Sequence, residues 1–209
     1  MNKLFIYINN FFQIKNYFQT IKNNYIRLNT ILKQSRINIK GINNRIVIGN
    51  GNIKRLKIGI NGTNNILNIH SNSILRDLNI IIEGENLEIV IKENCEIGSA
   101  DLVCCGKKTS ISIGENCLLA NNIEIRNCDG HSILENNQII NHSKSIDISS
   151  NVWICQNVKI LKGVKIDNNS VIALNSLVTQ GDYPPNVILA GSPAKIIKTN
   201  ISWSKERTD

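Results

Sequence analysis

Six positions in the last third of this chain are apolar at a constant interval of six residues, and this spacing constrains the fold more than any other feature. They are Ile148, Ile154, Ile160, Ile166, Ile172 and Val178. Four residues after each of the first five stands a small or β-branched residue: Val152, Val158, Val164, Ser170 and Ser176. An α-helix has about 3.6 residues per turn and a plain strand alternates every two residues, so neither explains the period. A triangular coil of short strands does, and the spacing therefore predicts a β-solenoid of hexapeptide repeats.

The same period occurs upstream in two blocks that are out of phase with each other. The apolar positions of these blocks are Ile91, Ile97 and Val103, then Ile113, Leu119 and Ile125. The change of phase predicts a small excursion at Cys104–Ser110. A second break lies between Ile125 and Ile148, where the expected apolar positions are polar. It predicts a loop that leaves the coil at about residues 134–145.

Before residue 90 the apolar runs are short and are separated by Asn- and Gly-rich turns, which predicts further but less regular coils. We expect one parallel β-helix domain at residues 41–190, followed by a C-terminal loop and short helix at 191–209. An ordinary β-sandwich also has short strands and turns, but it has no reason to keep a six-residue phase.

The N-terminal segment, residues 1–40, differs in composition from the rest. It holds seven of the 24 basic residues and no acidic one, which leaves 17 basic against 16 acidic residues in the remainder. This balance gives no sign of a nucleic-acid groove on the main domain. Apolar residues recur at threes and fours in the segment and predict a basic amphipathic helix. We expect the helix to pack on the solenoid or a neighbouring subunit, or to lie on an anionic membrane surface.

The six cysteines show no C-x-x-C pair, and the segment has neither the pattern of a signal peptide nor that of a membrane span. We therefore expect no disulfide framework and no metal site. Cys95 and Cys117 occupy the small position of the repeat, which predicts core residues. The expected location is the cytoplasm, or the inner face of the cytoplasmic membrane if the N-terminal helix binds lipid.

Of the three histidines, His131 is the candidate for chemistry. It stands at an expected inward position without being apolar, follows Gly130, and precedes the predicted loop. His70 lies in the early coils and His142 in the loop.

Several stretches of the chain resemble one family when they are taken in order. They are Asp129-Gly130-His131-Ser132-Ile133, Asn151-Val152-Trp153-Ile154, Ile160-Leu161-Lys162-Gly163-Val164, Asn168-Asn169-Ser170-Val171-Ile172, Ala190-Gly191-Ser192-Pro193-Ala194-Lys195 and Ile201-Ser202-Trp203. Together they resemble the hexapeptide-repeat acyltransferases with a left-handed β-helix. The resemblance is strongest to the branch that O-acetylates bacterial surface polysaccharides, including sialic acid polymers.

This resemblance implies a homotrimer that binds acetyl-CoA between adjacent subunits and a carbohydrate acceptor beside it. It implies that His131 is the catalytic base, since an imidazole can take the proton of a sugar hydroxyl near neutral pH as the oxygen attacks the thioester. Trp153 resembles the family tryptophan that walls the acetyl and acceptor site, and Asp129 is a candidate to orient the imidazole.

The resemblance also implies the contacts of the cofactor. The backbone at Ala173 and Thr179 would meet the pantetheine arm, and Lys195 and Lys198 would face the CoA phosphates, with Lys162 as a further candidate. The chain departs from the family pattern where Cys155 and Gln180 stand.

Other functions remain open at this point. A covalent mechanism through Cys128 is less favoured than direct transfer, because the thioester donor is already activated. A γ-class carbonic anhydrase shares the solenoid but needs three histidines on one zinc ion. A non-catalytic scaffold would need neither His131 nor Trp153. Within the family, the acceptor might instead be a nucleotide-sugar, an antibiotic or serine.

Overall fold

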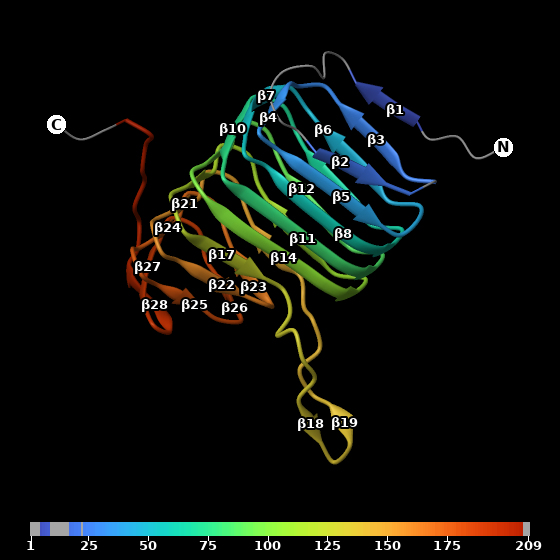
Figure 1. Cartoon of the computed structure of the whole chain (residues 1–209). Helices are drawn as coiled ribbons and strands as arrows, with labels where there is room; N and C mark the ends of the chain where they lie inside the picture. The colour runs from blue at the N-terminus through green and yellow to red at the C-terminus, as the bar shows by residue number, and fades with distance from the viewer. Residues whose placement is uncertain (1–4, 9–16, 22, 207–209) are drawn as a thin grey trace.

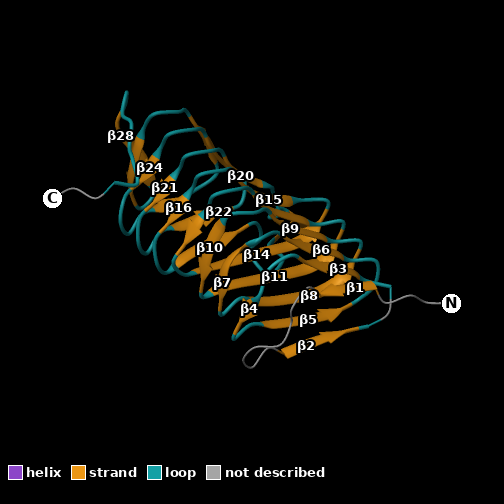
Figure 2. Cartoon of the chain, turned by 90° about the horizontal axis from the view of Figure 1, so that it is seen from above, coloured by secondary structure: helices purple, strands orange, loops and turns teal. Residues whose placement is uncertain are grey.

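A computed structural model describes residues 5–8, 17–21 and 23–206, and these residues form a β-solenoid with three parallel sheets (Figures 1 and 2). The first sheet contains β1 (Phe5–Ile8), β3 (Tyr25–Leu28), β6 (Arg45–Ile48), β9 (Ile66–Ile69), β12 (Glu88–Ile91), β15 (Ser110–Ile113), β20 (Ile146–Ile148), β23 (Val164–Ile166) and β26 (Gly181–Tyr183). The chain visits the first, second and third sheets in turn, so each circuit adds one strand to each side.

The other two sheets are built in the same way. The second contains β4 (Leu32–Lys33), β7 (Gly51–Lys54), β10 (Ser73–Arg76), β13 (Glu96–Ile97), β16 (Leu118–Leu119), β21 (Trp153–Ile154), β24 (Val171–Ile172), β27 (Ile188–Gly191) and the antiparallel β28 (Ala194–Lys198). The third contains β2 (Tyr17–Thr20), β5 (Arg36–Lys40), β8 (Lys57–Thr63), β11 (Leu78–Glu85), β14 (Ala100–Lys107), β17 (Ile123–Arg126), β22 (Lys159–Leu161) and β25 (Leu177–Val178).

The six-residue apolar period predicts the late coils correctly. Ile148 pairs with Ile166, Ile154 with Ile172, and Ile160 with Val178, so each partner stands 18 residues further along the chain. All of these side chains are buried, and so are the small residues four positions on. Three sides of six residues therefore enclose a core of stacked aliphatic side chains. The left-handed winding implied by the resemblance stays a prediction.

The change of phase upstream has a different cause from the predicted excursion at Cys104–Ser110. The early coils advance by 22 residues, as the pairing of Ile66 with Glu88 and of Glu88 with Ser110 shows. Their extra residues lie in longer strands of the third sheet, where β11 and β14 have eight residues each and β22 has three. The prediction of an excursion is wrong, because one side of the triangle is longer there.

Asparagine side chains close the corners of the early coils. Asn24, Asn44 and Asn65 are buried one above another. Asn44 donates from its backbone N–H and from Nδ2 to Oδ1 of Asn24, at 2.9 and 3.1 Å. Its own Oδ1 accepts the N–H of Asn65 at 3.0 Å, and Nδ2 donates to the carbonyl of Gly62 at 2.9 Å. This ladder satisfies backbone groups that the turn leaves without a partner.

The predicted N-terminal helix is wrong for the residues that the structure describes. Residues 17–21 and 23–40 contain β2, β3, β4 and β5 instead, and residues 1–4, 9–16 and 22 lie outside the described part. Ile26 and Leu28, like Ile37 and Ile39, alternate with exposed or half-buried neighbours and point into the core. The next coil offers each of these strands a hydrogen-bonding partner, and this tertiary pairing overrides the helical spacing. Across the described ranges no helix has the length and apolar character needed to cross a membrane.

The C-terminal segment also differs from the prediction of a short helix. Within residues 199–206 the chain runs in irregular, non-helical conformation. Trp203 lies against Trp153 with ring centroids 5.8 Å apart, and its Nε1 donates to the carbonyl of Asn151 at 2.7 Å. Lys205 donates to the carbonyl of Asn94 at 3.1 Å. These contacts along the second sheet compete with helix formation.

We expect Asn44→Ala to destabilise the fold by about 3 kcal/mol, because it leaves several buried backbone and side-chain groups without partners. Urea unfolding followed by circular dichroism measures the change, with the exposed Asn52→Ala as the matched control. Equal midpoints for the two variants would show that the ladder contributes nothing to stability.

Candidate functional site

The long interruption of the solenoid creates a surface cavity. Between β17 and β20 the chain leaves the coil as a hairpin formed by β18 (Leu134–Glu135) and β19 (Gln138–Ile139), which projects from the body in Figure 1. This places the predicted loop at 134–145 correctly. At the base of the hairpin lies a cavity of about 420 Å³. Its lining includes His131, His142, Asp129, Asn141 and Ser143.

His131 itself is exposed at the mouth of the loop and does not occupy the inward position that its spacing suggested. The chain has already left the coil at this point. Gly130, just before it, has a φ of 84°, which a residue without Cβ adopts at little cost and which turns the backbone outward. The side chain of His131 is therefore accessible to a substrate from outside the subunit.

Asn141 ties the two strands of the loop's neck together. Its Nδ2 donates to Oδ2 of Asp129 and to the carbonyl of His131, both at 2.8 Å. Its Oδ1 accepts the N–H of Ile133 at 2.7 Å. One side chain thus holds the backbone on both sides of His131. The sequence analysis missed Asn141, because its partners become neighbours only when the loop closes.

Asp129 acts on the same neck. Its Oδ2 accepts a hydrogen bond from Nζ of Lys162 at 2.5 Å, and Lys162 also donates to the carbonyl of Asn141 at 2.9 Å. The bond from Lys162, helped by Asn141, lowers the pKa of the Asp129 carboxyl. Because this pKa is lowered by folding, the pair stabilises the neck above the ordinary carboxyl range, and the benefit is lost as pH falls through the folded-state pKa.

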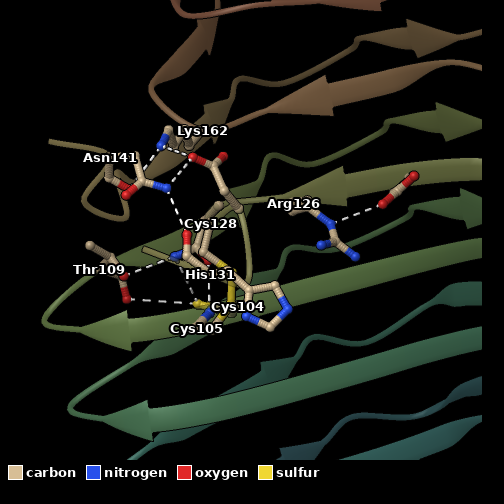
Figure 3. Close-up of a disulfide and its surroundings, with 11 residues drawn as sticks. Cys104, Cys105, Thr109, Arg126, Cys128, His131, Asn141 and Lys162 are labelled. Carbon is tan, nitrogen blue, oxygen red and sulfur yellow. Dashed lines mark hydrogen bonds and ion pairs between the residues drawn. A yellow bond between two sulfur atoms is a disulfide. The ribbon is translucent and has the colours of Figure 1, made fainter. Parts of the chain in front are cut away.

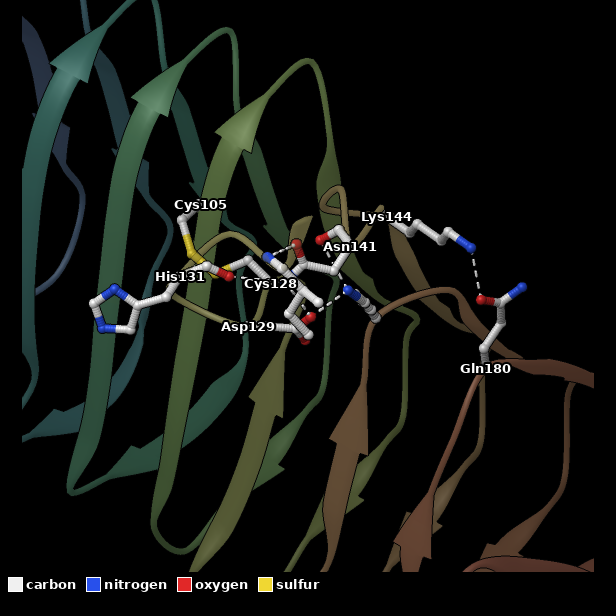
Figure 4. A network of polar contacts seen from close by, with 9 residues as sticks. Cys105, Cys128, Asp129, His131, Asn141, Lys144 and Gln180 are labelled. Carbon is white, nitrogen blue, oxygen red and sulfur yellow. Dashed lines mark hydrogen bonds and ion pairs between the residues drawn. A yellow bond between two sulfur atoms is a disulfide. The ribbon is translucent and has the colours of Figure 1, made fainter. Parts of the chain in front are cut away.

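The predicted role of Asp129 as a direct partner of the imidazole does not match this geometry. Figure 4 shows the imidazole of His131 pointing away from the carboxylate, which faces Lys162 and Asn141 instead. Asp129 therefore acts on the position of the loop, and Lys162 is engaged with it.

Asn127 fixes the corner that leads into the loop. It is fully buried, accepts the N–H of Cys105 at 2.7 Å and donates to Oγ1 of Thr109 at 2.8 Å (Figure 3). Its carbonyl accepts the N–H of Lys144 at the end of the loop, at 3.1 Å. Only the stacking of the coils brings these groups together.

Cys105 and Cys128, which line the cavity, form a disulfide with their Cα atoms 5.9 Å apart (Figure 3). The expectation of no disulfide is wrong here. The two cysteines are 23 residues apart in the sequence, which is close to one circuit of the early solenoid, so coil stacking makes them neighbours. In this state Cys128 offers no thiolate for a covalent mechanism. Cys95 and Cys117 are buried in the core as predicted, and burial raises the pKa of the Cys104 thiol to about 12.

The other residues predicted for the site lie on several sides of one subunit. Thr179 follows β25 on the same edge as Lys162, whereas Ala173 lies at the opposite end of the third sheet. Trp153 and Lys198 are on the second sheet, in β21 and β28. Lys195, in β28, pairs with Ala190 in the hairpin that the Ala190–Lys195 motif forms. One subunit alone therefore does not gather these residues around His131.

The backbone at two predicted cofactor contacts is already engaged within the chain. The N–H of Ala173 donates to the carbonyl of Leu189 at 2.8 Å. The carbonyl of Thr179 accepts the hydroxyl of Tyr183 at 3.0 Å. The N–H of Ala173 is thus committed to the solenoid, and any cofactor contact there must use other groups.

The third histidine, His70, lies on the first sheet, where its Nδ1 contacts Glu93 at 2.7 Å. Among the residues that the structure describes, no three His, Cys, Asp or Glu side chains gather in a way that could hold a metal ion. The histidines therefore do not converge as a zinc site of the carbonic anhydrase kind requires.

Comparison with solved structures finds two proteins that are similar over nearly the whole chain. One is the polysialic-acid-specific acetyltransferase NeuO, with 32% identity, coverage of 94% of this chain and 90% of that chain, and a TM-score of 0.82. The other is the polysialic acid O-acetyltransferase OatWY, with 33% identity, coverage of 94% and 93%, and a TM-score of 0.78. Comparisons with protein-family models and with curated proteins find no match.

We expect Asn141→Ala to lower turnover by about ten- to a hundredfold, because a small displacement of His131 removes the aligned geometry of a reacting group. Steady-state kinetics should show a fall in kcat with little change in the KM for the donor. The exposed Gln138→Ala, further out on the same hairpin, is the matched control. An unchanged kcat in a folded Asn141→Ala protein would contradict the role of the neck.

Proposed function

This chain belongs to the hexapeptide-repeat acetyltransferases, and within that family we propose that it transfers the acetyl group of acetyl-CoA to a hydroxyl of an acidic, sialic acid-containing surface glycan. The observation that carries this proposal is the position of His131. Its exposed imidazole lies in a cavity at the base of the loop, on a neck held by Asn141 and Asp129. The two acetyltransferases similar over 94% of the chain are named for polysialic acid, which supports this class of acceptor.

In the proposed reaction, His131 takes the proton of the acceptor hydroxyl as its oxygen attacks the carbonyl carbon of the acetyl thioester. The new C–O bond forms, the C–S bond of the tetrahedral intermediate breaks, and the proton passes to the departing thiolate of CoA. No second acyl carrier is needed, because the thioester is already activated.

The cavity supports a site that is shared between two subunits. Its volume of about 420 Å³ lies at the small end of the range for ligand sites, so it suits the acetyl end of the donor and leaves most of CoA outside. Trp153, Lys195 and Lys198 do not line it. A trimer that sets the second sheet of one subunit against the loop of the next would bring these residues to His131.

Acceptors of other kinds within the family, such as a nucleotide-sugar, and a non-catalytic scaffold are the alternatives. A scaffold has no use for an exposed histidine on a hydrogen-bonded neck. The nature of the acceptor rests on the two similar proteins and is settled by activity against a panel of sialylated and neutral glycans.

We expect His131→Ala to lose at least about 100-fold in turnover, because general-base catalysis contributes that much or more. Release of CoA thiol from acetyl-CoA in the presence of sialylated glycan measures it. His142→Ala is the matched control, since it removes a second imidazole from the same cavity. If His142→Ala abolishes turnover and His131→Ala does not, the base has been assigned to the wrong histidine.

A shared site also predicts complementation between two inactive variants. When His131→Ala and Trp153→Ala chains are co-expressed, roughly a quarter of the sites in a random trimer contain both native residues. We expect the mixture to recover activity that neither variant has alone. Native mass measurement gives the oligomeric state, and a mixture as inactive as its parts would place both residues in one subunit's site.

A further inference from the structure

The charge of this protein is divided sharply along the solenoid. The first acidic residue of the sequence is Asp77, and residues 1–76 hold 12 of the 24 basic residues. Residues 77–209 therefore hold 12 basic and 16 acidic residues. Because the described coils begin well before residue 41, much of this excess lies on the solenoid itself and not on a separate helix.

The excess is concentrated at the edge where the second sheet turns into the third. Lys33 is paired with Lys54, and Lys54 with Arg76, so three cations stand in one column on β4, β7 and β10. Around the corner, Arg36 is paired with Lys57 on β5 and β8. Figure 2 shows these two sets of strands meeting along the edge. We call these residues, together with Arg55 at the corner, the basic ridge.

Most of the ridge lacks a compensating carboxylate. Arg55 is paired with Asp77, and Arg36 lies over the ring of Tyr17 at 5.3 Å. Lys33, Lys54, Lys57 and Arg76 are exposed and form no ion pair with any residue in the described part of the chain. The charges of Lys54 and Lys57 add to the bond from Arg55 in lowering the pKa of Asp77.

Stacked like charges are unfavourable for the folded chain. Paired strands lie about 4.8 Å apart, and like charges opposite one another on paired strands destabilise a sheet. The fold gains nothing from three cations in one column, whereas a linear polyanion would meet a row of charges at regular spacing. This arrangement suits a chain of repeating carboxylates better than a single small anion.

The ridge is continuous with the proposed active site. In the second sheet β10 is followed by β13, β16 and β21, so Arg76 lies three strands from Trp153, roughly 15 Å away at the strand spacing. An acceptor whose reacting sugar lies beside Trp153 can therefore extend along the same face to the column of cations.

Building on the proposed function, we propose that the basic ridge is a second binding site for the acceptor, and that it holds the distal part of an acidic polysaccharide while one of its sugars is acetylated. The ridge makes the enzyme selective for long acidic chains. It leaves the chemistry at His131 and the binding of the donor untouched.

The test compares long polysialic acid with a short sialic acid oligomer as acceptors for wild type and for the triple variant Lys33→Gln, Lys54→Gln, Arg76→Gln. We expect the KM for the polymer to rise about tenfold in the variant, as three weak ion pairs are lost. The KM for the oligomer, the KM for acetyl-CoA and kcat should stay the same. Added salt should raise the polymer KM of wild type more than that of the variant.

The matched control removes three exposed cations elsewhere, with Lys92→Gln, Lys108→Gln and Lys159→Gln, and should leave the polymer KM unchanged. Thermal unfolding of the ridge variant should be unchanged or slightly improved, because repulsion is removed. A separate measurement uses the His131→Ala protein, with and without the ridge changes, on immobilised polysialic acid. It reports binding without turnover.

These arms separate the two ideas. If wild type does not acetylate sialylated acceptors but binds the polymer through the ridge, the proposed acceptor fails and the ridge stands. If wild type acetylates the polymer and the ridge variant has the same polymer KM, the ridge proposal is overturned. It is also overturned if the ridge changes abolish binding to vesicles of anionic phospholipid and leave polymer binding intact, since the ridge then serves a membrane surface.

Discussion

The structure depends on one constraint, which is that each coil hydrogen-bonds in parallel to the coil before it. Every residue therefore lies above an equivalent residue about 18 to 22 positions earlier. Like side chains meet like side chains, and the isoleucine core, the buried asparagine ladder and the column of cations at Lys33, Lys54 and Arg76 all follow from this rule. Burial stabilises the first, hydrogen bonding stabilises the second, and the third has no such compensation inside the chain.

The candidate site lies where this stacking is interrupted. A solenoid with unbroken corners presents flat faces, and a cavity needs a segment that leaves the coil and returns. Here the chain leaves at Cys128 and rejoins at Ile146, and the base of that excursion is closed by Asn141, Asp129 and Lys162. The regular coils hold Asn127 and Lys162 rigidly, and this rigidity is passed to the loop that carries His131. Catalytic geometry is in this way obtained from a scaffold whose own residues take no part in the reaction.

Much of the architecture could be predicted from the sequence, since a six-residue period over 30 residues has few physical explanations. The loop and the candidate histidine were found for the same reason, because a break in a strict pattern is easy to locate. The N-terminal helix was predicted wrongly: residues such as Ile26, Leu28, Ile37 and Ile39 also fit a helical face, and only the adjacent coil shows them to be strands. The neck residues were missed, because Asn141 has no distinctive spacing and acts through groups 8 to 12 residues away.

The sequence by itself determined the repeating side, the buried aliphatic positions and the point at which the coil is interrupted, because these depend on local periodicity. Only the tertiary structure decided which residues meet across coils. It paired Asp129 with Lys162 and joined Cys105 to Cys128. It also put Trp153 on a different sheet from the strand that leads to His131. The reason is that the length of each circuit, and not the order of residues within it, sets which side chains become neighbours.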